Sequence, residues 1–389
     1  MQYSNIRADN IKDESGVNAP IFDSNLSFDS TDHLVLPKGT TAQRPSSPST
    51  GAVRYNTDTS NVEYYDGTQW IEIIGLRSAD KGFFVAGARS TANATNTINT
   101  VNIATKQDAQ DFGALTINRS RMGGVGSSTR GIVAGGFRSS PAPGLSADID
   151  YFTLTTSGNG IDWGNNLNGA KSFMGACSDR TRGVWAGGVV PSPGTTTNVI
   201  DYVTIASQGT PVTDFGGTIS NSGQLGACAS PTRGVFAGGY TIPTSAVDTI
   251  EYITIQTTGS PATNFGNLTI GRKTHAGCSN AIRGVFGGGV DPGNTELSSV
   301  DYITIASTGN ALDFGDLTLA RDEIAACAGS NRGIFGCGDG TPVNFSTVMD
   351  YVTIPTLGNA FDFGVLRTPG TFGGYKAKAG LSNGHGGLS

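Results

Sequence analysis

An arginine–glycine pair recurs at a nearly constant spacing along the chain, each time before a short apolar stretch that ends in small residues. A period of about 50 residues is typical of repeat architectures, in which every repeat adopts the same small fold. The recurring basic positions are Lys81, Arg130, Arg182, Arg233, Arg283 and Arg332, of which Lys81 begins a degenerate first copy. This periodicity predicts six copies of one structural unit after about residue 76.

Each unit contains four segments of β type and none of helical type. Strand candidates such as Val203–Ile205 and Val352–Ile354 are rich in β-branched residues, and turn sequences such as Thr308–Asn310 bound them. These segments are too uniformly apolar to expose one face to water, so the sheets must be buried on both faces. A stack of such units either closes into a ring or caps its ends, and a ring of six four-stranded blades is the better interpretation.

The tail of the chain offers the strand that ring closure needs. The first unit has no inner strand before Lys81, because residues 70–76 belong to the preceding module. After Asp362–Gly364 the chain continues through Phe372–Lys378, at the spacing where an inner strand should fall. We therefore expect this tail to pair with Phe83–Ala86 and to leave no strand edge exposed.

The order of signals within a unit resembles that of the kelch, or galactose-oxidase-like, propeller family. The family has an arginine before an inner strand, a glycine pair, a tyrosine strand and an outer aromatic residue. In one copy these signals are Arg272, Gly288–Gly289, Tyr302 and Phe314. The resemblance covers about residues 76–380 and implies an all-β fold, a six-bladed kelch-like β-propeller with about 50 residues per blade.

The first 75 residues have a different composition. Residues 1–33 are polar without an apolar period, and we expect this extended segment to become ordered only against a partner. Residues 34–75 contain strand candidates at 53–56, 62–65 and 70–73, of which the last two flank an Asp66–Gly67 turn. This small β module resembles one that is common in bacteriophage tail fibres. The resemblance implies virion attachment through residues 1–33 and leaves residues 76–389 for the propeller.

Composition narrows the possible partners. A net charge of −6 disfavours a nucleic-acid surface, which needs a basic stripe. No apolar stretch approaches the length of a membrane span, and the N-terminus lacks the apolar core of a signal peptide. One repeat position holds cysteine in four successive units, Cys177, Cys228, Cys278 and Cys327, which predicts small buried core residues rather than disulfides. We therefore expect no nucleic acid, no membrane insertion, and assembly in the reducing host cytoplasm.

The candidate enzyme motifs are better explained as structural parts of the repeated fold. Asp-Phe-Gly occurs four times, at Asp111, Asp214, Asp313 and Asp362, whereas a kinase has one copy and a catalytic loop. Gly123–Thr129 lacks the Gly-Lys-Ser/Thr of a phosphate loop. The copper site of galactose oxidase needs paired histidines, and the repeats contain His275 alone. We therefore expect no enzymatic activity, no catalytic residues, no metal and no cofactor.

Acidic residues recur in step with the arginines, at Asp150, Asp201, Glu251, Asp301 and Asp350. The first unit has Lys81 and Asn99 at the two positions, and this parallel change suggests that the positions contact each other. We expect each arginine to form a structural ion pair with the acid of its own unit. A ring of carboxylates that holds cations is the alternative.

Function is expected in the part of the repeat that varies. The connections from the second to the third strand and from the fourth to the first share one face of the ring. The former differ between units, whereas the opposite face has short Ser/Thr-Gly-Asn turns. Varied, proline-stiffened loops on a repeated scaffold are a usual place for recognition. The candidate receptor-binding residues are Arg138, Pro141, Val190, Pro193, Tyr240, Thr241, Asp291, Asn294, Asn344 and Phe345, with Arg138, Tyr240 and Phe345 expected to be exposed. The alternative is that these loops vary without any binding role.

Together these features predict a bacteriophage virion protein, a tail fibre or adhesin in which a homotrimer displays propellers that bind a host-surface glycan or protein. We expect the N-terminal segment to contact other virion proteins. One alternative is a capsid, neck or baseplate decoration protein whose propeller makes virion contacts alone. The other is a polysaccharide-degrading tail enzyme, which a pocket of clustered acidic and aromatic residues would favour.

Overall fold

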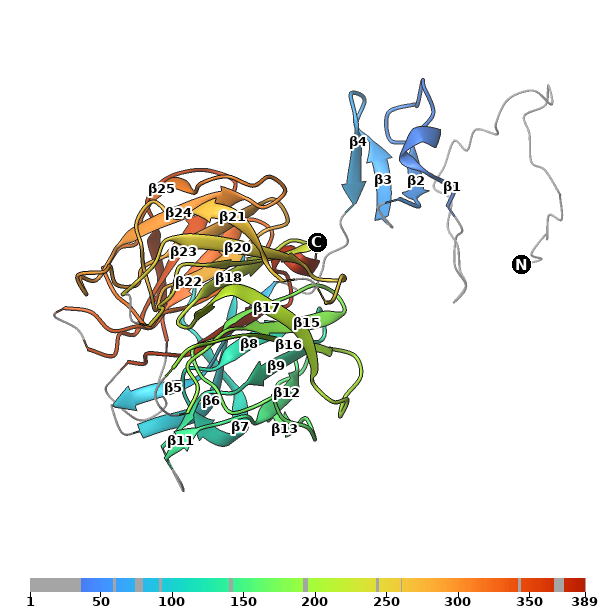
Figure 1. Ribbon diagram of the computed structural model, residues 1–389. Coiled ribbons are helices and arrows are strands. Elements are labelled where there is room, and N and C mark those ends of the chain that lie inside the picture. The colour runs from blue at the N-terminus through green and yellow to red at the C-terminus, as the bar shows by residue number, and fades with distance from the viewer. Residues whose placement is uncertain are drawn as a thin grey trace, which may run out of the picture. The chain divides into compact units, whose positions relative to one another are not determined.

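The computed structural model describes residues 36–58, 61–73, 80–90, 93–139, 143–191, 195–242, 245–259, 261–341, 344–366 and 374–388. The chain divides into two compact units, Met1–Arg77 and Ser78–Ser389, and each is considered by itself (Figure 1). The described residues are almost entirely strands and their connections, with two short 3-10 helices. The all-β prediction is therefore confirmed.

The first unit contains a small sheet with the strand order β1-β2-β3-β4. Its elements are β1 (Lys38–Gly39), the 3-10 helix η1 (Thr41–Gln43), β2 (Val53–Asn56), β3 (Asn61–Tyr65) and β4 (Trp70–Ile73). β1 is parallel to β2, and the other pairs are antiparallel. Between β3 and β4, the Asp66 Oδ1 accepts hydrogen bonds from the backbone N–H groups of Thr68 and Gln69, which closes the turn. The three predicted strands and their turn are confirmed.

The second unit contains six four-stranded antiparallel sheets within the described residues. We number them 1 to 6 along the chain and list the strands of each from first to fourth. Sheet 1 consists of β30 (Ala379–Ser382), β5 (Lys81–Ser90), β6 (Asn93–Asn102) and β7 (Gln110–Arg119), and sheet 2 of β8 (Gly123–Gly126), β9 (Arg130–Ala134), β12 (Ile149–Thr153) and β13 (Ile161–Asp162). Sheet 3 consists of β14 (Gly175–Ser178), β15 (Arg182–Ala186), β16 (Thr197–Thr204) and β17 (Thr213–Ser222), and sheet 4 of β18 (Gly226–Ala229), β19 (Arg233–Ala237), β20 (Thr249–Thr254) and β21 (Thr263–Asn267).

The last two sheets have the same plan. Sheet 5 consists of β22 (Ala276–Ser279), β23 (Arg283–Gly287), β24 (Ser299–Thr304) and β25 (Leu312–Asp316), and sheet 6 of β26 (Ala325–Ala328), β27 (Arg332–Gly336), β28 (Val348–Thr353) and β29 (Phe361–Val365). A short hairpin, β10 (Phe137–Arg138) with β11 (Gly144–Leu145), lies between the second and third strands of sheet 2. The 3-10 helix η2 (Gly386–Leu388) ends the described chain.

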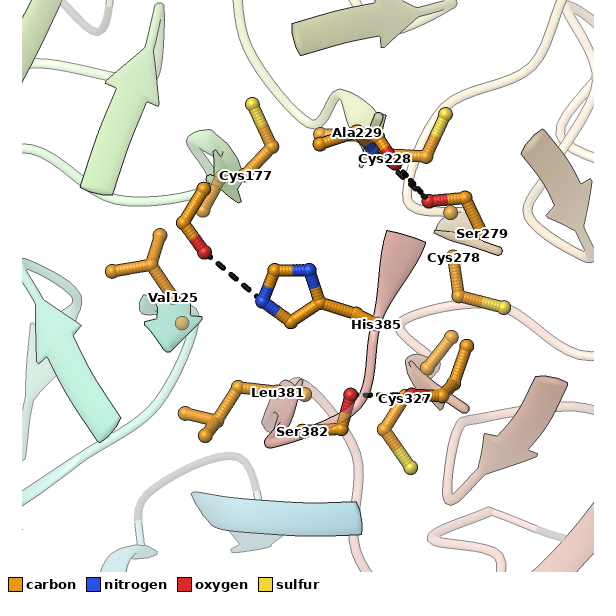
Figure 2. A pocket seen from close by; sticks show the side chains of 18 of the residues that line it. Val125, Cys177, Cys228, Ala229, Cys278, Ser279, Cys327, Leu381, Ser382 and His385 are labelled. Atoms are coloured by element: carbon orange, nitrogen blue, oxygen red, sulfur yellow. Dashed lines mark hydrogen bonds between the residues drawn. The ribbon is translucent and has the colours of Figure 1, made fainter. Parts of the chain in front are cut away.

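The first strands of the six sheets contact one another in a cycle. Each contacts the first strands of two neighbouring sheets, in the order β8, β14, β18, β22, β26, β30 and back to β8. Figure 2 shows labelled side chains from these six strands around a common centre, which His385 occupies. The innermost strands of sheets that are far apart in the sequence therefore lie around one axis.

The C-terminal strand completes sheet 1. In the antiparallel pairing of β30 with β5, Ala379 lies opposite Val85 and Leu381 opposite Phe83. The expected partner segment Phe83–Ala86 is thereby confirmed, but the strand begins later than the predicted Phe372–Lys378. Residues 372–373 lie outside the described chain, and the left-handed backbone of Ala377, with φ 55°, interrupts the extended run before β30.

The glycine of each arginine–glycine pair makes room for a side chain of the preceding sheet. A Cβ atom added to Gly234 would lie 2.7 Å from the Cys177 Sγ, and one added to Gly284 would lie 2.5 Å from the Cys228 Sγ. Because no side chain fits there, close packing requires the recurring glycine. The four repeated cysteines are free and buried, as predicted, and so is Cys337. Burial raises the pKa of the Cys228 thiol well above its ordinary value.

The repeated arginines do not pair with the repeated acids, so the expected ion pair is wrong. Each guanidinium instead lies over the tyrosine ring on the third strand of its own sheet, with 4.6 Å between the Arg283 Cζ and the Tyr302 ring centroid. It also donates to a carbonyl of the following sheet, from the Arg283 Nη1 to the Ile354 oxygen at 2.7 Å. The Arg332 Nη1 donates to the Ala104 oxygen of sheet 1 at 2.7 Å, which continues the cycle. These arginines therefore link neighbouring sheets.

Four of the five repeated acids pair with a second set of bases that the sequence interpretation missed. Asp301 pairs with Arg272 at 3.0 Å and Asp350 with Arg321 at 2.8 Å, and these side chains are buried. The equivalent buried pairs of sheets 2 and 3 are Asp150–Arg119 and Asp201–Lys171. Each base lies four residues before the first strand of its sheet. Since these carboxylates already have cationic partners, they do not form the alternative cation-binding ring.

Candidate functional site

The predicted recognition residues lie at one end of the axis. In each of the six sheets, the base of the second-to-third connection forms an isolated bridge with the segment before the first strand, as Tyr240 does with Gly223. The second-to-third and fourth-to-first connections therefore share one end, which we call the varied face. The described candidates on it are Arg138, Val190, Tyr240, Thr241, Asp291, Asn294, Asn344 and Phe345, whereas Pro141 and Pro193 lie outside the described residues.

Two aromatic candidates on the varied face lie beneath lysines. The Lys273 Nζ is 5.2 Å from the Tyr240 ring centroid, and the Lys376 Nζ is 5.0 Å from that of Phe345. Both rings are half-buried, and so is Arg138, whose Nη1 lies 3.7 Å from the Asp148 Oδ2. The expectation that these side chains are freely exposed is therefore wrong. The lysines cover part of each ring and restrict its orientation.

Six residues at one position of the repeat form a collar around the axis on the varied face. The collar consists of Arg121, Phe173, Gln224, Thr274, Glu323 and Ala377. All six have a left-handed backbone, with φ between 47° and 61°, a conformation that costs a residue other than glycine about 1–3 kcal/mol. Backbone hydrogen bonds run from one member to the next, for example from the Phe173 N–H to the Arg121 oxygen and from the Gln224 N–H to the Phe173 oxygen. Contacts between sheets therefore fix this geometry, and it presents six different side chains.

The collar surrounds a cavity of about 80 Å³. The second layer of its wall is formed by Met122, Met174, Leu225, His275, Ile324 and Lys378. Within the collar, the Arg121 guanidinium lies 4.8 Å from the Phe173 ring centroid, and its Nη2 donates to the Glu323 Oε1 at 3.2 Å. Burial lowers the pKa of His275 to about 3, so its imidazole is neutral at physiological pH. The cavity thus has polar and aromatic groups at its mouth and a largely apolar floor.

The C-terminal residues occupy the other end of the axis (Figure 2). The His385 Nε2 lies 2.9 Å from the Gly126 oxygen and 3.2 Å from the Ser178 Oγ, both at the last residues of first strands. The Arg180 Nε donates to the Leu388 oxygen at 3.1 Å, and η2 is buried. A cavity of about 50 Å³ lies among the first strands beside His385. The chain end therefore packs against the end of the axis opposite the collar.

Lys378 is the residue of sheet 1 in the second layer of the cavity wall. The equivalent residues of the other five sheets are uncharged. The buried Lys378 Nζ lies 3.9 Å from the Tyr375 ring centroid and 3.3 Å from the Asn99 Oδ1. Asn99 holds the position of the repeated acids, so this sheet lacks the carboxylate that elsewhere compensates a buried base. Burial lowers the pKa of Lys378 to about 7.

We expect the Lys378→Met substitution to remove a pH dependence of stability, and methionine is the residue at two equivalent positions. The unfolded lysine has a pKa of about 10.4, so between pH 7 and that value the unfolded state binds more protons, and wild-type stability rises with pH. Between pH 7.5 and 8.5, the wild-type free energy of unfolding should gain about 1.2 kcal/mol relative to the variant. Urea titrations measure this difference, to which the four cysteines of the first strands contribute equally in both proteins. A pH-independent difference contradicts the expectation.

The sheet of the first unit has a polar and an apolar face. On the polar face, the buried Glu63 carboxylate accepts a hydrogen bond from the Arg44 Nε at 3.2 Å and one from the Asn56 Nδ2 at 3.1 Å. The hydrogen bond with Arg44 lowers the pKa of Glu63. Strand alternation places apolar residues on the opposite face. These are Val53, Tyr55, Val62, Tyr64 and Ile71, of which Val53 is exposed and the others are half-buried.

Comparison with known proteins bears on this first unit. Residues 15–100 match the family described as the phage tail like trimerisation region. The match includes β1 to β4 and continues through β5 into β6 of the second unit. No curated protein matches the chain. The family match indicates a phage tail structural protein of the virion and supports formation of a homotrimer.

No helix in the described ranges is long and apolar enough to cross a membrane. The same ranges contain no group of three or more histidine, cysteine, aspartate or glutamate side chains arranged to hold a metal ion.

Proposed function

We propose that this chain is the receptor-binding subunit of a phage tail fibre, in which a homotrimer binds the host surface through the varied face. One observation carries the proposal: a uniform framework of six sheets places unlike loops and unlike collar side chains at the same end of one axis. Uniform residues elsewhere in the repeat serve packing, whereas variation confined to one end suits recognition. The match to a phage tail family supports the choice of a host-cell surface as the target of this recognition.

Within this proposal, the second unit is a six-bladed, kelch-like β-propeller. The cyclic contacts of the first strands support this interpretation, as does the pairing of β30 with β5. The links from arginines to the following sheet support it independently, because they connect sheet 6 to sheet 1. The proposal assigns no catalytic step to any residue.

The apolar face of the first unit is our candidate for the trimer contact. Five apolar side chains on a half-exposed sheet face are costly to leave in water, and the opposite face is already occupied by the Glu63 cluster. Further copies of the same face would cover it, and the match to a trimerisation region points to that occupant. The attachment segment 1–33 lies outside the described residues and remains a proposal made from the sequence.

A decoration protein of the capsid, neck or baseplate is the second candidate. Such a protein would have the same trimer and the same propeller as the receptor-binding subunit. Its varied face would bind another virion protein instead of the host surface. Binding of the isolated protein to host cells therefore separates the two candidates.

We expect the double substitution of Tyr240 and Phe345 by alanine to weaken adsorption to host cells. Loss of two aromatic anchors reduces the binding free energy by on the order of 2 kcal/mol or more, which corresponds to about a 30-fold loss of affinity. Fluorescently labelled protein measures adsorption, and an unchanged thermal midpoint shows that the variant is folded. The matched control substitutes Ser157 and Thr308, both exposed on opposite-face turns, by alanine. Equal adsorption by both variants, or none by the wild type, favours the decoration protein.

A further inference from the structure

The collar combines unused hydrogen-bond donors with unused acceptors. In the described part of the chain, neither the Gln224 Oε1 nor the Arg121 Nε has a hydrogen-bond partner. The Glu323 Oε2 lies 3.5 Å from the Lys376 Nζ and makes no hydrogen bond with a described residue. The Thr274 Oγ1 donates its one hydrogen to the Lys273 oxygen, at 2.6 Å, or to the Asp322 Oδ2, at 3.1 Å, and either bond leaves its own lone pairs as acceptors. An unpaired buried polar atom costs about 1–3 kcal/mol, so a ligand that both donates and accepts would stabilise this wall.

The collar has side chains at six positions where glycine would relieve the strain of the left-handed backbone. Glycine adopts the left-handed conformation freely, and this chain contains 57 glycines among 389 residues, yet none stands in the collar. The backbone hydrogen bonds between collar members need no side chain at all. A ring with a structural role alone would therefore gain from glycine, whereas a recognition site depends on the side chains.

The charged groups at the mouth of the cavity are paired with one another or hydrogen-bonded. Arg121 pairs with Glu323, Lys376 pairs with Glu323 and Asp339, and the Asp322 carboxyl lies 3.1 Å from the Thr274 Oγ1. Of the remaining titratable groups in the wall, His275 is neutral because burial lowers its pKa to about 3, and the Lys378 Nζ is buried against a tyrosine ring. An anion accepts hydrogen bonds and an ammonium donates them, whereas a hydroxyl does both. The wall therefore matches an uncharged ligand with several hydroxyl groups.

We propose that the collar binds a neutral sugar residue of a host-surface glycan. Hydroxyl groups of the sugar bond to the side chains of Arg121, Gln224 and Thr274, and the apolar face of its ring lies against Phe173. The cavity of about 80 Å³ has room for several water molecules, at about 10–15 Å³ each, and admits one edge of a sugar ring. This inference rests on the proposed function and deepens it, because it names the receptor class and adds a contact on the axis to those of the surrounding loops.

Saturation-transfer NMR on the full-length protein tests the inference, with the methyl glycosides of glucose, galactose, mannose and N-acetylglucosamine as probes. We expect transfer to at least one glycoside. Thr274→Val keeps the shape of the side chain and every charge, and combined with Gln224→Leu it should weaken that binding at least tenfold. The Ser157→Ala and Thr308→Ala control should bind as the wild type does. No transfer to any probe, as in a cavity that holds water alone, overturns the inference, and so does equal transfer to the collar variant.

Cell adsorption separates this inference from the proposed function. If the wild type and the collar variant adsorb equally well to host cells, the collar is not the receptor contact, while receptor binding by the protein stands. If the wild type binds a glycoside through the collar but does not adsorb to cells, the sugar site stands and the proposed function fails. Loss of both glycoside binding and adsorption in the collar variant supports both.

Discussion

Deletion of residues 374–389 is expected to leave a protein that aggregates or unfolds far below the wild-type thermal midpoint. The deletion removes β30 and exposes the edge of β5, which invites pairing between chains. It also removes Leu381, which lies against Gly131 of sheet 2, and Gly380, which lies against the backbone of Ala326 in sheet 6. Both contacts between sheet 1 and its neighbours along the axis are therefore lost together.

Light scattering and thermal unfolding measure this effect, and deletion of residues 383–389 is the matched control. The shorter deletion keeps β30 and loses the contacts of His385 and Leu388, so we expect a soluble protein with a modestly lower midpoint. A soluble protein of unchanged midpoint after the longer deletion contradicts the cyclic arrangement of the sheets.

The double substitution Tyr64→Lys with Ile71→Lys is expected to convert the trimer into monomers. These residues lie opposite each other in the register of β3 and β4, on the apolar face of the first unit. Burying two ammonium groups in an interface without partners costs several kcal/mol for each subunit. The mass measured by light scattering should fall to one third of the trimer mass, while the six sheets of the second unit remain folded.

Thr68→Lys with Gln69→Lys provides the charge-matched control, because both residues are exposed in the turn between β3 and β4. It should leave the trimer intact. If the double variant is still a trimer, the apolar face does not form the subunit contact.

The elements that could be predicted from the sequence are those with a local signal. The strands of the small β module follow from alternation and an Asp-Gly turn, and they match β2, β3 and β4. The spacing of the repeats alone predicts the C-terminal strand several residues too early. The sequence Ala379–Ser382 has the small-residue pattern of Gly175–Ser178 and Ala276–Ser279, and that resemblance would have given the correct register.

The wrong pairing of arginines with acids has a geometric cause. Equal periodicity shows that two positions recur together, but it does not show which side chains share a face. In sheet 3, Arg182 lies opposite Thr204 and Asp201 lies opposite Trp185, so the two charged residues are far apart along the strands. Tyr202 is the diagonal neighbour of Arg182 on the same face. The correct bases were visible in the sequence as the residues four positions before the first strands of sheets 2, 3, 5 and 6.

The collar could not be predicted because nothing in its composition recurs. Its six members have different side chains. None of them is glycine, asparagine, aspartate or histidine, the residues most often found in the left-handed conformation. Their shared geometry comes from backbone hydrogen bonds between sheets, which are tertiary contacts. The region that our proposals use most is thus the one for which the sequence carries the weakest signal.

Electron microscopy of intact particles that carry a gold-labelled tag in the loop at Gly293 tests the central claim most directly. This loop is exposed on the varied face, whereas the C-terminus is unsuitable because η2 is buried. A trimeric receptor-binding fibre predicts labels in groups of three at the outer ends of tail fibres. Labels on the capsid or neck, or held against the tail tube, contradict it and identify a decoration protein.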